Sequence, residues 1–178
     1  MARKRGTETV GDMVRSMLVV LIPVAFVAGL VGLLRPSDPE VRDVAWQPAL
    51  ESAREGAGFT ALGPSQVPAG WTVTRVALEP DPPSSTGVWR MNLVTDAGEY
   101  VGLVQRTGDV AGVARSEIPG YVAEEASLVA GATWQQYVEE GADEPDHALV
   151  RDTGDSVVVV LTSASDYSLA ESFAASLR

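Results

Sequence analysis

Ala148-Leu-Val-Arg151 and Ser156-Val-Val-Val-Val-Leu-Thr162 are two apolar runs that stand on either side of the turn Asp152-Thr-Gly154. Runs rich in β-branched residues around a short turn with Asp and Gly are typical of a β-hairpin, because glycine readily takes the left-handed conformation that such turns need. The sequence therefore predicts an antiparallel sheet that contains this hairpin.

The same order of elements precedes the hairpin in the first half of the chain. Strands are expected over 71–79, 88–95 and 99–106, with Asp96-Ala-Gly98 as a second turn, followed by a short helix over 109–118. A strand over 133–139 leads into the hairpin, and a last helix begins at Ser165 or Asp166 with an apolar side that packs on a sheet. A further short helix is expected over 47–56. We expect one α+β domain with an antiparallel sheet of about six strands and helices on one face, in an order consistent with two βββα halves.

Residues 17–34 form an apolar run without a charged side chain, from Met17 to Leu34. As a helix this run is roughly 27 Å long, close to the thickness of the hydrocarbon core of a bilayer. Basic residues precede it, so we expect a cytoplasmic tail over 1–16, a transmembrane helix over 17–34, a linker over 35–43 and an extracytoplasmic domain over 44–178. A cleaved signal peptide is the alternative, although the run is long for one and its end offers no suitable cleavage site. The expected location is the plasma membrane, with a single pass and the lipid bilayer as a partner of residues 17–34.

The charge is divided unevenly between the two parts of the chain. Residues 1–35 hold five basic and two acidic side chains, whereas residues 36–178 hold eight basic and twenty-two acidic ones, which accounts for the net charge of −11. An acidic surface repels phosphate backbones, so we expect no nucleic-acid partner. The sequence contains no cysteine, so no disulfide supports the domain and its stability depends on a hydrophobic core.

The order of several short motifs along the chain resembles a known family. The motifs are Val67-Pro-Ala-Gly-Trp71 at the start of a strand, Tyr100-Val-Gly-Leu-Val104, His147-Ala-Leu-Val-Arg151 before a valine-rich strand, and Ser168-Leu-Ala-Glu-Ser-Phe-Ala-Ala-Ser-Leu177. This order resembles an actinobacterial family of single-span membrane proteins of unknown function, domain-of-unknown-function family 4245. The resemblance implies an envelope protein outside the plasma membrane and transfers no catalytic residue.

Side chains with catalytic chemistry are scarce in the expected extracytoplasmic domain. Cysteine is absent from the sequence, the only lysine is Lys4 in the expected cytoplasmic tail, and the only histidine is His147. One histidine without cysteine does not supply a zinc site, and the acidic run from Glu139 to Asp146 lacks the spacing of a calcium loop. We therefore expect a protein that is not an enzyme and has no cofactor or metal.

Four tryptophans are the remaining feature of interest. Trp71, Trp89 and Trp134, together with Trp46, supply either a pocket for an apolar or carbohydrate ligand or the core between sheet and helices. The leading hypothesis is a non-enzymatic interaction module of the cell envelope that binds another envelope protein. The alternative is a carrier or sensor domain for a lipid, glycan or peptide, with Trp71, Trp89 and Trp134 at its pocket. The sequence leaves the oligomeric state and the identity of partner or ligand open.

Overall fold

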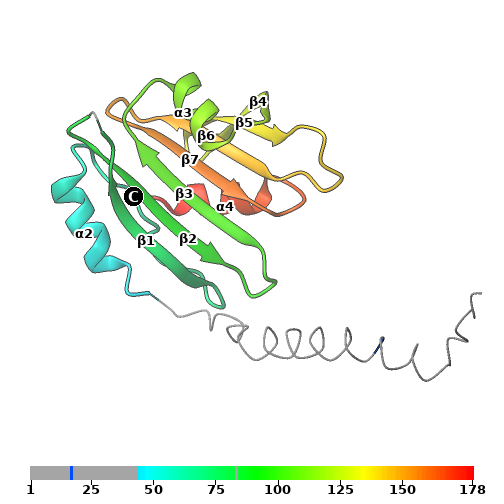
Figure 1. Cartoon of the computed structure of the whole chain (residues 1–178), viewed down its shortest axis with the longest axis horizontal. Helices are drawn as coiled ribbons and strands as arrows, with labels where there is room; N and C mark the ends of the chain where they lie inside the picture. The colour runs from blue at the N-terminus through cyan, green and yellow to red at the C-terminus, as the bar shows by residue number, and fades with distance from the viewer. Residues whose placement is uncertain (1–16, 18–43, 83) are drawn as a thin grey trace, which may run out of the picture. The chain divides into compact units, whose positions relative to one another are not determined.

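Seven antiparallel strands form one sheet in the computed structural model, which describes residues 17, 44–82 and 84–178. The order of the strands across the sheet is β1-β2-β3-β7-β6-β5-β4 (Figure 1). The strands are β1 (Thr72–Pro80), β2 (Gly87–Val94), β3 (Tyr100–Arg106), β4 (Tyr121–Val129), β5 (Ala132–Glu139), β6 (His147–Asp152) and β7 (Val157–Thr162), and the helices are α2 (Gln47–Gly56), α3 (Val110–Glu117) and α4 (Ser168–Ser176).

The predicted hairpin is present as β6 and β7, and β7 also pairs with β3. The two halves of the chain are therefore joined in the middle of the sheet. Both predicted turns contain a glycine with positive φ, at +84° for Gly98 and +94° for Gly154. These conformations are ones that glycine adopts at little cost, which explains the two sharp reversals.

The prediction of about six strands in two βββα halves is wrong for the second half, which has four strands before its helix. The missed strand is β4, with the sequence YVAEEASLV. Alanine and glutamate are depleted in strands, and most residues of β4 are exposed, so neither composition nor alternation marked it. The first half has the predicted order of three strands and a helix.

The prediction that the helices cover one face of the sheet is also wrong. Side chains alternate along β7, so that Val158 and Val160 lie in one core with residues of α2 and α4, whereas Val157 and Val159 lie in another core with residues of α3. A strand buried on both faces is expected to be apolar along its length, and β7 is apolar from Val157 to Leu161, before Thr162 at its end. Helices therefore pack on both faces, and the sheet is the middle of three layers.

The expected tail, transmembrane helix and linker over 1–43 lie outside the described residues, apart from Met17. Within the described residues, no helix combines the length and the apolar character needed to cross a membrane.

Candidate functional site

Strand β4 is an open edge of the sheet. It pairs with β5 on one side, and within the described residues no strand pairs with its other side. Its burial pattern leaves six of its nine residues exposed, including Leu128 at 75% and Val122 at 43%. At the opposite edge, by contrast, β1 accepts a backbone hydrogen bond from Val44 to Val73. An open edge carries unpaired N–H and C=O groups that can pair with another chain.

The turn between β4 and β5 shows which backbone groups face outward. Ala130 and Gly131 have φ angles of 49° and 82°, the conformation of a two-residue hairpin turn of type I′. Val129 and Ala132 close this turn, and the hydrogen-bonding direction alternates from that pair along the strand. Ala126 and Leu128 therefore direct their N–H and C=O groups away from β5, toward the open side.

A β-bulge interrupts the middle of β4, between Ala123 and Ala126. Within it, the Glu124 carboxylate accepts a hydrogen bond of 2.7 Å from the Tyr167 hydroxyl, which ties the strand to the start of α4. Burial, and then this bond, raise the pKa of Tyr167. Glu125 is exposed. A bulge with charged side chains is a common protection of an edge against pairing with a second copy, because two such edges would place like charges together.

The start of β4 lies among carboxylates from the end of β5 and the loop before β6. Tyr121 pairs with Glu139 across the sheet, and Asp146 also acts on its hydroxyl. The pKa of Tyr121 is raised by burial first and then by Asp146 and Glu139. The pKa of Asp146 is itself raised, mainly by burial and secondly by the charge of Glu139. Glu140 in the same loop is exposed, so this end of the strand has a negative electrostatic potential.

A hollow of about 320 Å³ opens between α3 and the beginning of β4. Two aromatic side chains, Tyr121 and Tyr137, and one cation, Arg115, are part of its wall. The described residues of the lining are Ala111, Ala114, Arg115, Ile118, Pro119, Gly120, Tyr121 and Tyr137. Tyr121 therefore belongs both to the wall of the hollow and to the open edge strand β4.

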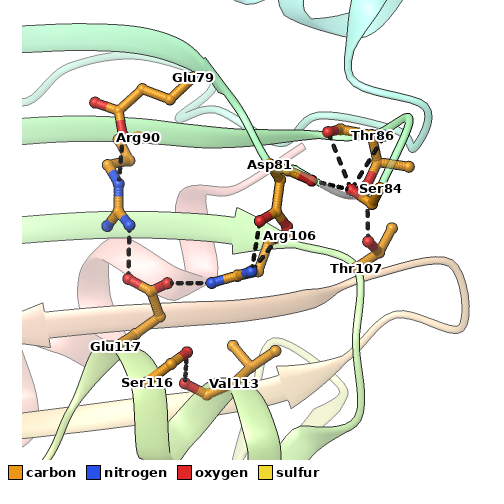
Figure 2. Close-up of polar contacts among 10 residues, drawn as sticks. All are labelled: Glu79, Asp81, Ser84, Thr86, Arg90, Arg106, Thr107, Val113, Ser116 and Glu117. Carbon is orange, nitrogen blue, oxygen red and sulfur yellow. Dashed lines mark hydrogen bonds and ion pairs between the residues drawn. The ribbon is translucent and has the colours of Figure 1, made fainter.

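Helix α3 forms one wall of the hollow and is fixed at both ends. Asp109 caps its N-terminus by accepting a 2.8 Å hydrogen bond from the Gly112 N–H, which agrees with the predicted helix over 109–118. At its other end Glu117, with a side chain only 8% exposed, lies between Arg90 of β2 at 2.8 Å and Arg106 of β3 at 2.9 Å (Figure 2). These two ion pairs hold α3 against the sheet and so fix the wall of the hollow.

Each arginine of this network has a second carboxylate partner. Arg90 Nε lies 3.2 Å from Glu79, and Arg106 donates from Nη2 to both oxygens of Asp81 at 2.8 Å. Figure 2 shows Glu117 placed between the two guanidinium groups. The network alternates groups of opposite charge and continues from Glu79 to Arg75 at 2.6 Å, which is the arrangement of a structural clamp.

The three predicted pocket residues lie in different surroundings. Trp89 and Trp134 are buried, at 0% and 1% exposure, and Trp89 Nε1 donates a 2.9 Å hydrogen bond to the Leu62 carbonyl. Trp71 is half-buried and stacks on Phe173 with 6.2 Å between ring centroids. It lines a second hollow of about 320 Å³, which also includes Trp46.

His147 is buried in a structural position. Its Nδ1 lies 3.0 Å from the Ala164 carbonyl oxygen, and its ring meets the Tyr167 ring edge-on at 4.6 Å between centroids. Among the described residues, no three His, Cys, Asp or Glu side chains converge in a manner suited to a metal ion.

Sequence reasoning missed the open strand and the tyrosine hollow beside it. Pro119-Gly120 before Tyr121 and Gly131 before a strand are turn signals, and the ten residues 121–130 lie between them. Ten residues between two turns are enough for one strand, so these signals point to β4 even though its composition does not.

Comparisons with known proteins identify the family of this chain. One chain of the MucA/MucB complex from Pseudomonas aeruginosa is 18% identical, with a TM-score of 0.35, and the match covers 66% of this chain and 34% of that one. LpqN, described as involved in cell envelope biogenesis of Mycobacterium tuberculosis, is 13% identical, with a TM-score of 0.22 and coverage of 57% and 68%. No curated protein matches the sequence. A family model matches residues 5–177, and the chain therefore belongs to the family of proteins of unknown function DUF4245.

Proposed function

We propose that the protein is a non-enzymatic interaction module of the cell envelope, anchored in the plasma membrane through residues 17–34, and that a partner polypeptide docks on strand β4. The observation that carries this proposal is the open edge of β4, where Ala126 and Leu128 direct backbone groups outward and the Leu128 side chain is 75% exposed. Addition of an extended segment to such an edge is a general mode of peptide recognition.

The anchor and the location rest on the sequence. The apolar run over 17–34 has the length of a membrane span, and the basic residues before it favour a cytoplasmic N-terminus. The domain over 44–178 is then extracytoplasmic. Protease added to spheroplasts should degrade this domain while cytoplasmic control proteins stay intact, and a domain that resists until the membrane is dissolved would contradict the proposed location.

The absence of enzymatic activity is proposed from the side-chain chemistry. The sequence has no cysteine and a single histidine, and that histidine is buried against Ala164 and Tyr167. General acid–base or nucleophilic catalysis would have to depend on hydroxyl and carboxyl groups alone.

Site-specific crosslinking tests the docking edge. A photoreactive amino acid at Leu128 of the full-length chain in its native cells should give one defined adduct, whereas the same group at Glu51, exposed on α2, should not. Ala126→Pro removes an outward N–H without removing a bond to β5, so it should abolish the adduct. Equal adducts from both positions, or an adduct that survives Ala126→Pro, would contradict docking on β4.

A carrier or sensor domain is the second candidate. The hollow beside Trp46 and Trp71 supports it, because its volume of about 320 Å³ lies at the lower end of small-ligand pockets. Binding of glycans or lipids that quenches tryptophan fluorescence in wild type but not in Trp71→Leu would favour this function over the first.

A further inference from the structure

The hollow lined by Tyr121 and Tyr137 lies beside strand β4, on one face of the sheet. Ala123 is opposite Tyr137 across the sheet, and Tyr121 is two residues before Ala123, so these three side chains share one face. A strand that pairs with β4 lies about 4.8 Å from it, and its side chains on that face stand next to Tyr121. A long side chain at this point reaches the hollow.

The walls of the hollow favour a positive charge. The faces of Tyr121 and Tyr137 attract cations through their ring quadrupoles, and Asp146 and Glu139 act on the Tyr121 hydroxyl from close by. Among the described residues of the lining, Arg115 is the one cation, and it is exposed on α3, where water screens it. These two carboxylates, near the Tyr121 hydroxyl, would repel an anionic ligand, so a cation is the better fit.

The charges along the edge exclude one alternative occupant. A second copy of β4 would bring the exposed Glu125 of each chain toward the bulge of the other, and β4 itself contains no lysine or arginine. Pairing between two copies would therefore add repulsion, and β4 of the second copy would bring no basic side chain to the hollow.

We propose that the segment which adds to β4 is basic and extended, and that one of its lysine or arginine side chains enters the hollow lined by Tyr121 and Tyr137. This inference rests on the proposed function and names the chemistry of the partner. Exposed carboxylates at Glu125 and Glu140 extend the complementary surface on either side of Tyr121.

Peptide binding to the full-length chain in nanodiscs of zwitterionic lipid tests this inference. The probes are three fluorescent eight-residue peptides with alternating Val-Lys, Val-Thr and Val-Glu, whose polar side chains all lie on one face when extended. Fluorescence anisotropy should show that Val-Lys binds at least about tenfold more tightly than Val-Glu at physiological salt. Tyr121→Leu should weaken the binding of Val-Lys about tenfold. Tyr121→Phe keeps the ring and should leave its Kd within about twofold, which separates loss of the cation contact from loss of the fold.

A matched pair of double variants controls for net charge. Glu125→Lys with Glu140→Lys should weaken the binding of Val-Lys, whereas Glu51→Lys with Glu55→Lys, which makes the same charge change on α2, should not. Equal weakening by both pairs would overturn the inference, since binding would then depend on total charge alone.

The two proposals fail in distinguishable ways. If Val-Thr binds as tightly as Val-Lys and Ala126→Pro abolishes the binding of both, the edge is a docking site but the preference for a basic partner is wrong. If Ala126→Pro leaves the binding of Val-Lys unchanged, docking on β4 is wrong.

Discussion

Removal of the Glu117 charge should cost the domain a large part of its stability. The Glu117 side chain is 8% exposed and forms ion pairs with Arg90 at 2.8 Å and Arg106 at 2.9 Å, whose side chains are 29% and 24% exposed. Breaking one partner out of a buried ion pair costs about 3–5 kcal/mol. Both arginines keep a second carboxylate in Glu79 and Asp81, so we expect Glu117→Gln to cost about 3 kcal/mol, the low end of that range.

Urea denaturation of the full-length chain in detergent, followed by circular dichroism, measures this loss. At about 4 °C per kcal/mol for a domain of this size, the same change lowers the Tm by about 12 °C. Glu55→Gln, at an exposed position of α2, should change the free energy of unfolding by less than about 0.5 kcal/mol. A Glu117→Gln variant as stable as the Glu55→Gln control would refute the reasoning, because the ion pairs of Glu117 would then contribute nothing measurable to the attachment of α3.

Four further variants test single features of the domain. The Thr60 N–H donates to Asp155 at 3.0 Å and lowers the pKa of that carboxyl. The ionised carboxylate therefore stabilises the native state above about pH 4, and this contribution disappears as the pH falls through the native pKa. Asp155→Asn should be less stable than wild type at pH 7, and urea titrations at low pH should show that the difference in free energy of unfolding disappears. Burial raises the pKa of Asp146, so ionisation of this carboxyl opposes folding. Asp146→Asn should be at least as stable as wild type at pH 7, and any gain in the free energy of unfolding should disappear below about pH 4. A variant less stable than wild type at pH 7 would contradict this expectation. Gly154→Ala should cost about 1–2 kcal/mol in thermal unfolding through backbone strain alone, because its φ is +94° and a Cβ there would touch nothing within 4 Å. Phe173→Ala should cost about 3–5 kcal/mol and change the near-UV circular dichroism of Trp71, and an unchanged spectrum would show that the two rings do not stack in solution.

The strands with a strong apolar pattern could be predicted from the sequence. The valine run of β7 is buried on both faces, and the turn glycines Gly98 and Gly154 have the expected positive φ. Such positions are governed by local chemistry, namely β-branched side chains and a conformation that only glycine adopts easily. These positions were sufficient to predict an antiparallel sheet and its hairpins β2–β3 and β6–β7.

The candidate site could not be predicted because long-range arrangement determines it. Exposed and buried residues do not alternate along β4, so its sequence lacks the alternation of apolar and polar residues that identifies a strand. Tyr121 and Tyr137 come together beside α3 only because β4 pairs with β5. The side of the sheet on which α3 packs is likewise set by which valines of β7 face it. Tertiary context decides such features, since both faces of an apolar strand are equally able to receive a helix.

The place of β7 in the sheet has a consequence for how the chain acquires its structure. Its neighbours are β3 and β6, and the β3 partners of its residues lie more than fifty positions earlier in the chain, as with Arg106 and Val157. β7, the last strand in the order of synthesis, therefore takes a central place in the sheet. Until β7 has been synthesised, β3 has no neighbouring strand on that side. Closing so large a loop is slow, and an incomplete sheet of this kind is prone to aggregation during synthesis. Chaperones that shield nascent chains should therefore act on this protein mainly in the interval between the emergence of β3 and that of β7.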